Sequence, residues 1–306
     1  MADIQTWNVT EPYISMKCGL GEAPFYEDET KSLRFVDIVK QKLHIVNLKE
    51  GPHSLESFDL SDPVSTTADI EGDGDKIIVG AKNGFAFMDR KTKKLDYINK
   101  VWGEKDGLGK DERMRFNDGF VDPEGRYFAG TMNDPLKTQL TDEGVLFRLD
   151  PNLNLHRVIE KVTIPNGMGF TLDEKSMYFI DSPTKNIWKF QYNRDSGDIS
   201  NREVFYHVVH AGVPDGMAMD VDGSLWVALA GGGKVLKISS EGKLVGEINL
   251  PTRMITCPAF AGEDLYITSA EEEEPSTYPD SVKYGGSLFR IHVGVKGLPV
   301  YKFQRA

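Results

Sequence analysis

The chain is poor in the features that mark secreted, membrane and disulfide-stabilised proteins. Its 306 residues contain two cysteines, Cys18 and Cys257, too few for a disulfide framework and without the CxxC spacing of a metal knuckle. No apolar run approaches the roughly 18 residues of a membrane span. The N-terminal residues show neither the basic segment nor the apolar core of a secretory signal. We therefore expect a reducing compartment, the cytoplasm.

Positive charge is also scarce. Lys and Arg number 36 against 47 Asp and Glu, which gives a net charge of −11. Nucleic-acid binding requires clustered Lys and Arg that replace counterions, so this composition argues against it and against an anionic membrane surface. The sequence also lacks the GxSxG nucleophile elbow of serine hydrolases. An acidic surface is compatible with a bound cation and with neutral polar substrates.

What the chain does contain is a repeat of hydrophobic strands. Their midpoints lie near residues 35, 78, 128, 179, 226 and 266, with spacings of roughly 40 to 51 residues that are typical of propeller blades. No segment shows sustained helical periodicity. We predict an all-β chain, a six-bladed β-propeller with four-stranded antiparallel blades, forming a single domain over residues 1–306. The last unit is expected to comprise Leu265–Thr268, Ser287–His292 and Val300–Phe303.

Short polar signatures precede four of these strong strands, just before or on the innermost strand of each unit. Equivalent points of a propeller converge on its axis, so oxygen-bearing side chains at these points are expected to meet there. Hard cations prefer carboxylate and carboxamide oxygens. The alternative to a cation site is that each Asn-Gly or Asp-Gly pair only forms a turn. The signatures are Glu22 in Gly21–Pro24, Asn117-Asp118-Gly119, Asn166-Gly167 and Asp215-Gly216.

Glu22, Asn166 and Asp215 are accordingly predicted to bind one divalent cation. Ca²⁺ is the first choice, with Zn²⁺, Mn²⁺ or Mg²⁺ as alternatives. Arg115 lies two residues before Asn117, so both side chains face the same way in an extended segment and can hold the oxygens of a polyol. A surface Arg paired with a neighbouring acid is the alternative. Asp118 is expected to point away and to fix the backbone.

At these residues the chain resembles the senescence-marker-protein, or regucalcin/gluconolactonase, family. The resemblance covers nearly the whole chain, and its most specific stretch is the run that begins at Arg115. The matching segments are Arg115–Gly119, Val121–Pro123, Gly125–Met132, Gly21-Glu22, Phe35–Ile38, Ile199–Arg202, Pro214–Met217, Leu225–Ala228 and Gly294–Gly297.

The resemblance implies a six-bladed propeller with an axial divalent cation that hydrolyses sugar-acid lactones. It implies that Glu22, Asn166 and Asp215 are metal ligands, that Arg115 and Asn117 bind substrate, and that Asp215 is the general base. One departure concerns the loop after Met132, where Asn133-Asp134-Pro135 replaces the paired acids of animal members. The family also includes luciferin-regenerating proteins, phosphotriester hydrolases and Ca²⁺-binding proteins.

The hypothesis is therefore metal-assisted opening of an aldono-1,4- or 1,5-lactone. A non-catalytic Ca²⁺-binding regulator and an ester or phosphotriester hydrolase that uses the same metal remain alternatives. The expected partner is a small sugar lactone, and the expected state is a monomer or weak homo-oligomer. The sequence leaves open whether Cys18 and Cys257 lie close together.

Overall fold

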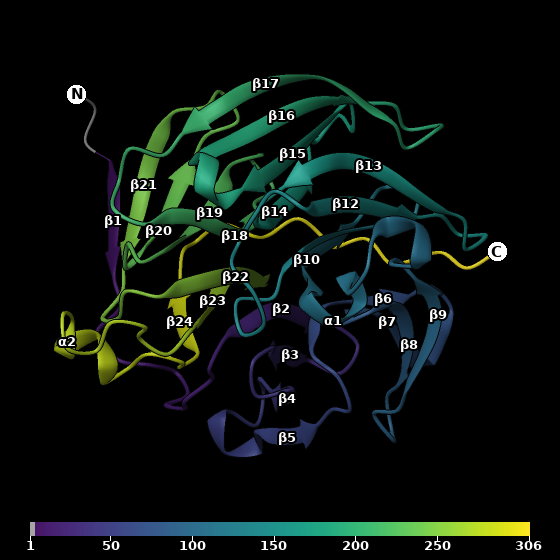
Figure 1. The fold of residues 1–306 in the computed structure, drawn as a ribbon. Coiled ribbons are helices and arrows are strands. Elements are labelled where there is room, and N and C mark those ends of the chain that lie inside the picture. The colour runs from purple at the N-terminus through teal and green to yellow at the C-terminus, as the bar shows by residue number, and fades with distance from the viewer. Residues whose placement is uncertain (1–3) are drawn as a thin grey trace.

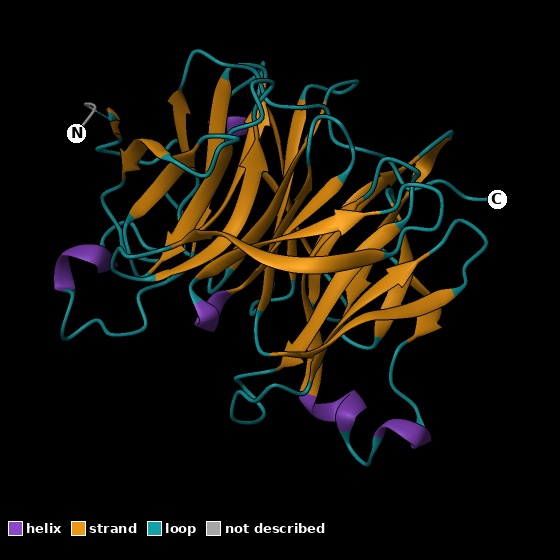
Figure 2. Ribbon diagram, turned by 90° about the horizontal axis from the view of Figure 1, so that it is seen from above, coloured by secondary structure: helices purple, strands orange, loops and turns teal. Residues whose placement is uncertain are grey.

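In the computed structural model, which describes residues 4–306, six sheets are arranged in a ring (Figure 1). Almost all of the regular structure is strand, and the helices are single turns (Figure 2). The predicted six-bladed propeller is confirmed. Among the described residues, no helix is long and apolar enough to cross a membrane. The helical segments are η1 (Pro52–Ser54), η2 (Glu104–Asp106), α1 (Lys110–Arg113), η3 (Ser182–Thr184) and α2 (Pro279–Val282).

Four of the blades are plain four-stranded antiparallel sheets whose strands follow one another from the axis outward. Blade 1 comprises β2 (Gly21–Glu27), β3 (Ser32–Asp37), β4 (Lys42–Asn47) and β5 (Glu56–Asp59); blade 2 comprises β6 (Val64–Ile70), β7 (Asp73–Ala81), β8 (Gly84–Asp89) and β9 (Leu95–Lys100); blade 3 comprises β10 (Met114–Val121), β11 (Tyr127–Asn133), β12 (Gly144–Leu149) and β13 (Leu155–Val162); blade 4 comprises β14 (Pro165–Phe170), β15 (Ser176–Asp181), β16 (Asn186–Tyr192) and β17 (Ile199–His207).

The N-terminal segment completes the last two blades. In blade 5, β1 pairs in parallel with the outermost strand, β21. In blade 6, which has three strands, Ile14 forms an antiparallel bridge with Leu288 in the place of a fourth strand and so closes the ring. Blade 5 comprises β18 (Val213–Met219), β19 (Leu225–Ala230), β20 (Lys234–Ile238), β21 (Leu244–Asn249) and β1 (Gln5–Asn8); blade 6 comprises β22 (Ile255–Ala261), β23 (Asp264–Ser269) and β24 (Phe289–His292).

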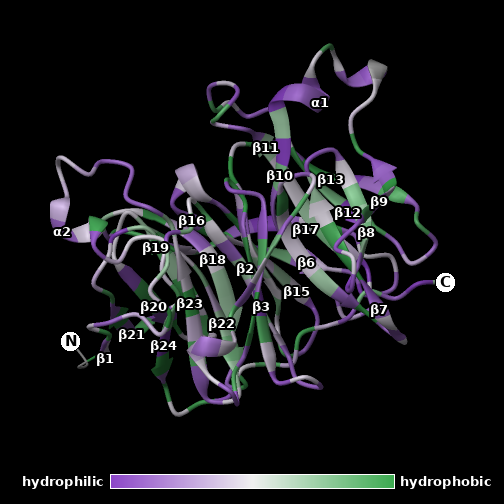
Figure 3. Cartoon of the chain, turned by 90° about the horizontal axis from the view of Figure 1, so that it is seen from below, coloured by the Kyte–Doolittle hydropathy of each residue, from purple (hydrophilic) through white to green (hydrophobic). Residues whose placement is uncertain are grey.

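Strands inside the ring are buried on both faces because each blade packs between two others. In β3, Leu33 and Phe35 pack towards Tyr266 of blade 6. Val36 points the opposite way and packs with Val79 of blade 2. Successive side chains of a strand face opposite sides, so one continuous apolar run serves two interfaces. Hydrophobic residues accordingly lie within the strands, whereas α1 and many loops are hydrophilic (Figure 3).

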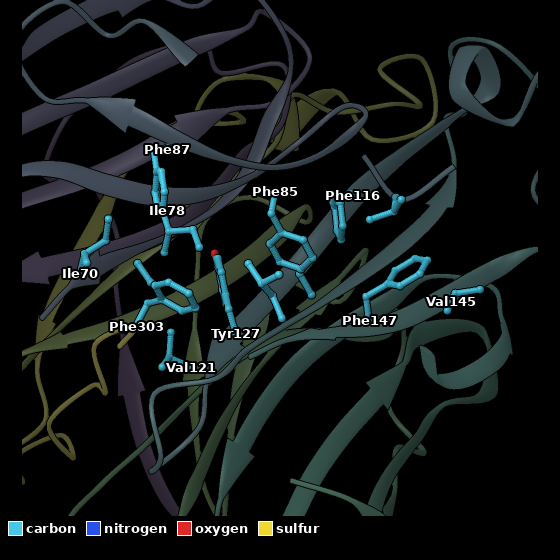
Figure 4. Packing of buried hydrophobic residues seen from close by; sticks show 14 of the residues in the cluster. Ile70, Ile78, Phe85, Phe87, Phe116, Val121, Tyr127, Val145, Phe147 and Phe303 are labelled. Atoms are coloured by element: carbon cyan, nitrogen blue, oxygen red, sulfur yellow. The ribbon is translucent and has the colours of Figure 1, made fainter. Parts of the chain in front are cut away.

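The polar signatures lie on the innermost strands, as predicted, and the strong hydrophobic strands are the second strands of their blades. One expectation about strands was wrong, because residues Val300–Phe303 do not belong to blade 6. The C-terminal segment crosses one end of the ring, where Phe303 pairs with Ile70 of blade 2 (Figure 1). Phe303 is fully buried beside Tyr127 in the core between blades 2 and 3, as Figure 4 shows.

Each innermost strand contains an irregularity of register against its neighbour. In β2, for example, pairing jumps from Glu22 to Phe25, and in β18 it jumps from Pro214 to Met217. Equivalent breaks occur in β6, β10, β14 and β22. A bulge interrupts the alternation of side chains and re-aims them. The six bulges place the polar signatures at equivalent points around the axis.

Candidate functional site

The five predicted site residues all lie on innermost strands, at or next to the bulges. Glu22 is on β2, Arg115 and Asn117 are on β10, Asn166 is on β14 and Asp215 is on β18. All five side chains are buried, each with less than a tenth of its surface exposed. Polar side chains at such depth need partners, and those of these residues are one another, nearby backbone groups and Ser182.

A run of hydrogen bonds joins blades 3 and 4 across this region. Arg115 Nη1 donates to Asn117 Oδ1 at 2.8 Å, as their two-residue spacing predicts. Asn117 Nδ2 donates to Asn166 Oδ1 at 3.2 Å and to the Pro165 carbonyl at 2.9 Å. Asn166 Nδ2 in turn donates to Ser182 Oγ at 2.8 Å. Asn117 thus connects the predicted substrate-binding Arg to a predicted metal ligand.

The carboxylates of Glu22 and Asp215 act on each other. Burial raises the pKa of Glu22 well above its ordinary value, and the negative charges of Asp215 and Asp118 raise it further. Burial, followed by the charge of Asp118, likewise raises the pKa of Asp215. The Arg115 guanidinium offsets part of this repulsion. The fold thus holds several carboxylates close together where water is largely excluded, an arrangement common at functional sites.

This donor set fits a divalent cation. Glu22 and Asp215 supply two negative charges, and Asn166 adds a neutral oxygen. The backbone is strained beside Glu22: Ala23 has a φ of 48°, and its N–H donates to Glu22 Oε2 at 2.9 Å. A non-glycine residue in the left-handed region costs free energy that the surrounding fold must offset. The bulge therefore fixes the direction of the Glu22 carboxylate.

Asp118 also belongs to this group of charged side chains. Its membership was not predicted from the sequence. Its Oδ1 accepts the Gly119 N–H at 2.7 Å, so the expected backbone role is present. Its charge also raises the pKa values of Glu22 and Asp215, and burial raises its own pKa to about 6. Strict alternation predicted that Asp118 faces away from Asn117. The bulge between Phe116 and Gly119 interrupts that alternation.

The loop that departs from the family pattern reaches the site through Asp134. Its Oδ1 lies 3.9 Å from Arg115 Nε, and both side chains are buried. The Asp134 N–H donates to the Arg113 carbonyl, which ties the loop to the start of β10. Asn133 is held elsewhere, because its Oδ1 accepts from Thr141.

A cavity of about 1080 Å³ approaches the same axis from the other end of the ring. The turns between the first and second strands of blades 1, 2, 4 and 6 border it, as does the C-terminal segment, and Met168, Met217 and Met219 line its wall. Asp118 lies on its surface, whereas none of the five predicted site residues does. The candidate site therefore lies at the opposite ends of the innermost strands, where those strands begin.

Comparison with known proteins shows the family of this chain. The family model described as "SMP-30/Gluconolactonase/LRE-like region" matches residues 20–271. The chain belongs to this family. Regucalcin of Danio rerio is 35% identical over 96% of this chain and 97% of its own. The putative sugar lactone lactonase YvrE of Bacillus subtilis is 33% identical over 91% of this chain and 92% of its own.

Among solved structures, one described as a calcium-binding protein, regucalcin, from Agrobacterium tumefaciens superposes with a TM-score of 0.86. It is 23% identical and covers 99% of both chains, so it supports the fold of this SMP-30/gluconolactonase member. The resemblance stated from the motifs is confirmed. The individual roles of Glu22, Asn166, Asp215, Arg115 and Asn117 remain predictions.

Proposed function

We propose that this protein is a divalent-metal-dependent lactonase that opens sugar-acid lactones of the aldono-1,4- or 1,5-lactone class. The observation that carries the proposal is the pair of buried, mutually repelling carboxylates, Glu22 and Asp215, beside Asn166 in a member of a gluconolactonase family. These three residues would hold the cation, with Ca²⁺ as first choice. The regucalcin and lactonase names of the relatives are consistent with this choice.

The bound cation would supply Lewis-acid polarisation of the lactone carbonyl. Asp215 accepts the proton of the attacking water as general base. Arg115 and Asn117 orient the lactone through its oxygens, and their mutual hydrogen bond fixes both side chains before substrate arrives. The Asp134 carboxylate, 3.9 Å from Arg115 Nε, offsets the positive charge of the guanidinium.

The setting proposed for this reaction is the cytoplasm, where two free cysteines are stable. The enzyme acts as a monomer or weak homo-oligomer on a small molecule, without a nucleic-acid or membrane partner. Its net charge of −11 supports that part of the proposal.

The test is hydrolysis of a panel of aldonolactones by chelator-treated protein supplied with Ca²⁺, Mg²⁺, Mn²⁺ or Zn²⁺. We expect metal-dependent opening of at least one lactone and its loss in Asp215→Asn, by on the order of a hundredfold or more, because the proton acceptor is removed. Asp222→Asn, in an exposed turn of the same blade, is the matched control and should keep full activity.

Two results would overturn the proposal. Metal binding with no turnover of any lactone would favour a Ca²⁺-binding regulatory protein, the alternative that the regucalcin relatives support. Faster turnover of phosphotriesters than of lactones would show that the site hydrolyses a different class of ester. Full activity of a folded Asp215→Asn variant would remove Asp215 from the mechanism.

A further inference from the structure

A second cluster of possible metal ligands lies away from the axis, at the closure of the ring. Cys18 precedes β2, Asp37 ends β3 and His44 lies on β4. All three side chains are buried, and one ligand atom from each lies within 4.8 Å of the other two. The cluster combines sulfur, nitrogen and oxygen, unlike the all-oxygen set of the candidate lactonase site.

The His44 ring is held in one orientation. Its Nδ1 lies 2.7 Å from Ser57 Oγ, and its face stacks on Phe35 with 4.9 Å between ring centroids. The opposite nitrogen, Nε2, lies 3.8 Å from Cys18 Sγ. Histidines that bind metals characteristically use one ring nitrogen for the ion and the other for a hydrogen bond that fixes the ring. Ser57 provides that bond here.

The Asp37 carboxylate is also fixed by the backbone. Oδ1 accepts the N–H groups of Leu20 and Lys40 at 3.2 and 3.0 Å, and Oδ2 accepts that of Gly19 at 2.8 Å. An ionised carboxylate has about four acceptor positions, so one or more remain for an ion. Burial is the main cause that raises the pKa of the Cys18 thiol, and the negative charge of Asp37 raises it further.

The spacing of the ligand atoms matches a small tetrahedral ion. Zinc bound to sulfur at about 2.3 Å and to nitrogen at about 2.0 Å separates these two atoms by roughly 3.5 Å. The observed Cys18 Sγ to His44 Nε2 distance is 3.8 Å. A thiolate and a carboxylate neutralise a divalent charge, which a buried site requires. The ammonium group of Lys40 lies nearby and would repel a cation. Its pairing with Glu271 at 3.0 Å offsets that positive charge.

We propose that Cys18, Asp37 and His44 form a structural site for a thiophilic divalent ion, first of all Zn²⁺. Cys18 also bonds through its backbone to Gly286 and Glu271 of blade 6. An ion at this point would join blade 6, the N-terminal segment and blade 1, where the ring closes. Binding would release the thiol proton, and water would take the remaining coordination position.

The test is titration of chelator-treated, reduced protein with Cd²⁺ and Zn²⁺ in excess Ca²⁺. We expect one Cd²⁺ per chain with an ultraviolet thiolate-to-metal absorption band, and a raised thermal midpoint with Zn²⁺. Cys18→Ser should lose the band, while Cys257→Ser, which removes the other buried free cysteine, should keep it. Ser57→Ala should weaken binding by about tenfold or more, because the support of the His44 ring is lost.

The two sites are distinguishable. Asp215→Asn should leave the Cd²⁺ band unchanged, whatever its effect on lactone turnover. A wild-type protein without a thiolate band, or a band that survives in Cys18→Ser, would overturn the proposal. If Cys18→Ser fails to fold, His44→Ala provides the same test, and an unchanged Cd²⁺ affinity in that variant would equally contradict the site.

Discussion

Arg34 is a single buried residue that stabilises the contact between blades 1 and 2. It is 1% exposed and stacks on the Phe25 ring at 3.8 Å. Its guanidinium bonds to Glu27 and to Asp69, and Arg90 bonds to the same two acids from the cavity side. The four charges neutralise one another between blades 1 and 2.

Arg34→Met should lower the free energy of unfolding by about 3 kcal/mol, because the buried Glu27 carboxylate and the partly buried Asp69 carboxylate lose one of their two cations. Burial raises the pKa of Glu27, but Arg34 and Arg90 outweigh it and hold the pKa below its usual value. The network therefore stabilises the fold above about pH 4 and loses this contribution as the pH falls through the lowered pKa. Denaturant unfolding at neutral and acidic pH measures both effects.

Lys42→Met is the matched control for Arg34→Met. Lys42 pairs with Asp59 in the same blade, but both side chains are exposed. Exposed pairs contribute at most about 1 kcal/mol. Equal losses in the two variants would show that the Arg34 network contributes no more than a surface pair.

At the scale of the element, the bulged innermost strand is the unit that builds the site. Its polar residues, glycines and prolines give it no hydrophobic pattern, so the sequence predicts the second and outer strands of the blades but not the innermost ones. Close contact between neighbouring innermost strands explains this composition. A Cβ on Gly216 of β18 would lie 2.5 Å from Cys257 Sγ and 2.9 Å from Cys257 Cα of β22.

Gly216→Ala should therefore force β18 away from β22. We expect a loss of about 1–3 kcal/mol in unfolding free energy, typical of overpacking, together with weaker Ca²⁺ binding because Asp215 moves with its neighbour. Calorimetric Ca²⁺ titration and thermal unfolding check this. Gly74→Ala is the control, since nothing lies within 4 Å of a Cβ there. Unchanged Ca²⁺ affinity in Gly216→Ala would contradict the close-contact argument.

At the scale of the whole molecule, both termini tie distant blades together. The N-terminal segment closes blade 6 through Ile14 and Leu288. The C-terminal segment bonds from Leu298 to Met219 of blade 5 and from Phe303 to Asp69 of blade 2. Ring closure gives every blade two packed neighbours.

A chain that ends at Pro299 should lose this tie. Phe303 is fully buried, and loss of a buried Phe side chain costs about 3–5 kcal/mol. We expect a thermal midpoint lower by roughly 6 °C or more, measured by circular dichroism. Val300→Thr, at a half-exposed position in the same segment, should leave the midpoint nearly unchanged. A truncated chain as stable as the full one would show that the segment is dispensable.

The sequence alone determined the repeat, the number of blades and the family. Strand composition and spacing are local properties, and the motif from Arg115 to Gly119 is specific. The sequence also predicted that the side chains of Arg115 and Asn117 face the same way, because residues two apart in an extended chain lie on the same side. Their 2.8 Å hydrogen bond confirms that prediction.

Only the tertiary structure decided how the blades present their polar residues. Bulges at the axis placed Asp118 among the charges of Glu22 and Asp215, against strict alternation. Packing within blade 1 brought Cys18 beside His44, and the C-terminal segment left blade 6 for blade 2. These contacts join residues far apart in the chain, and their geometry depends on blade packing that no local pattern encodes.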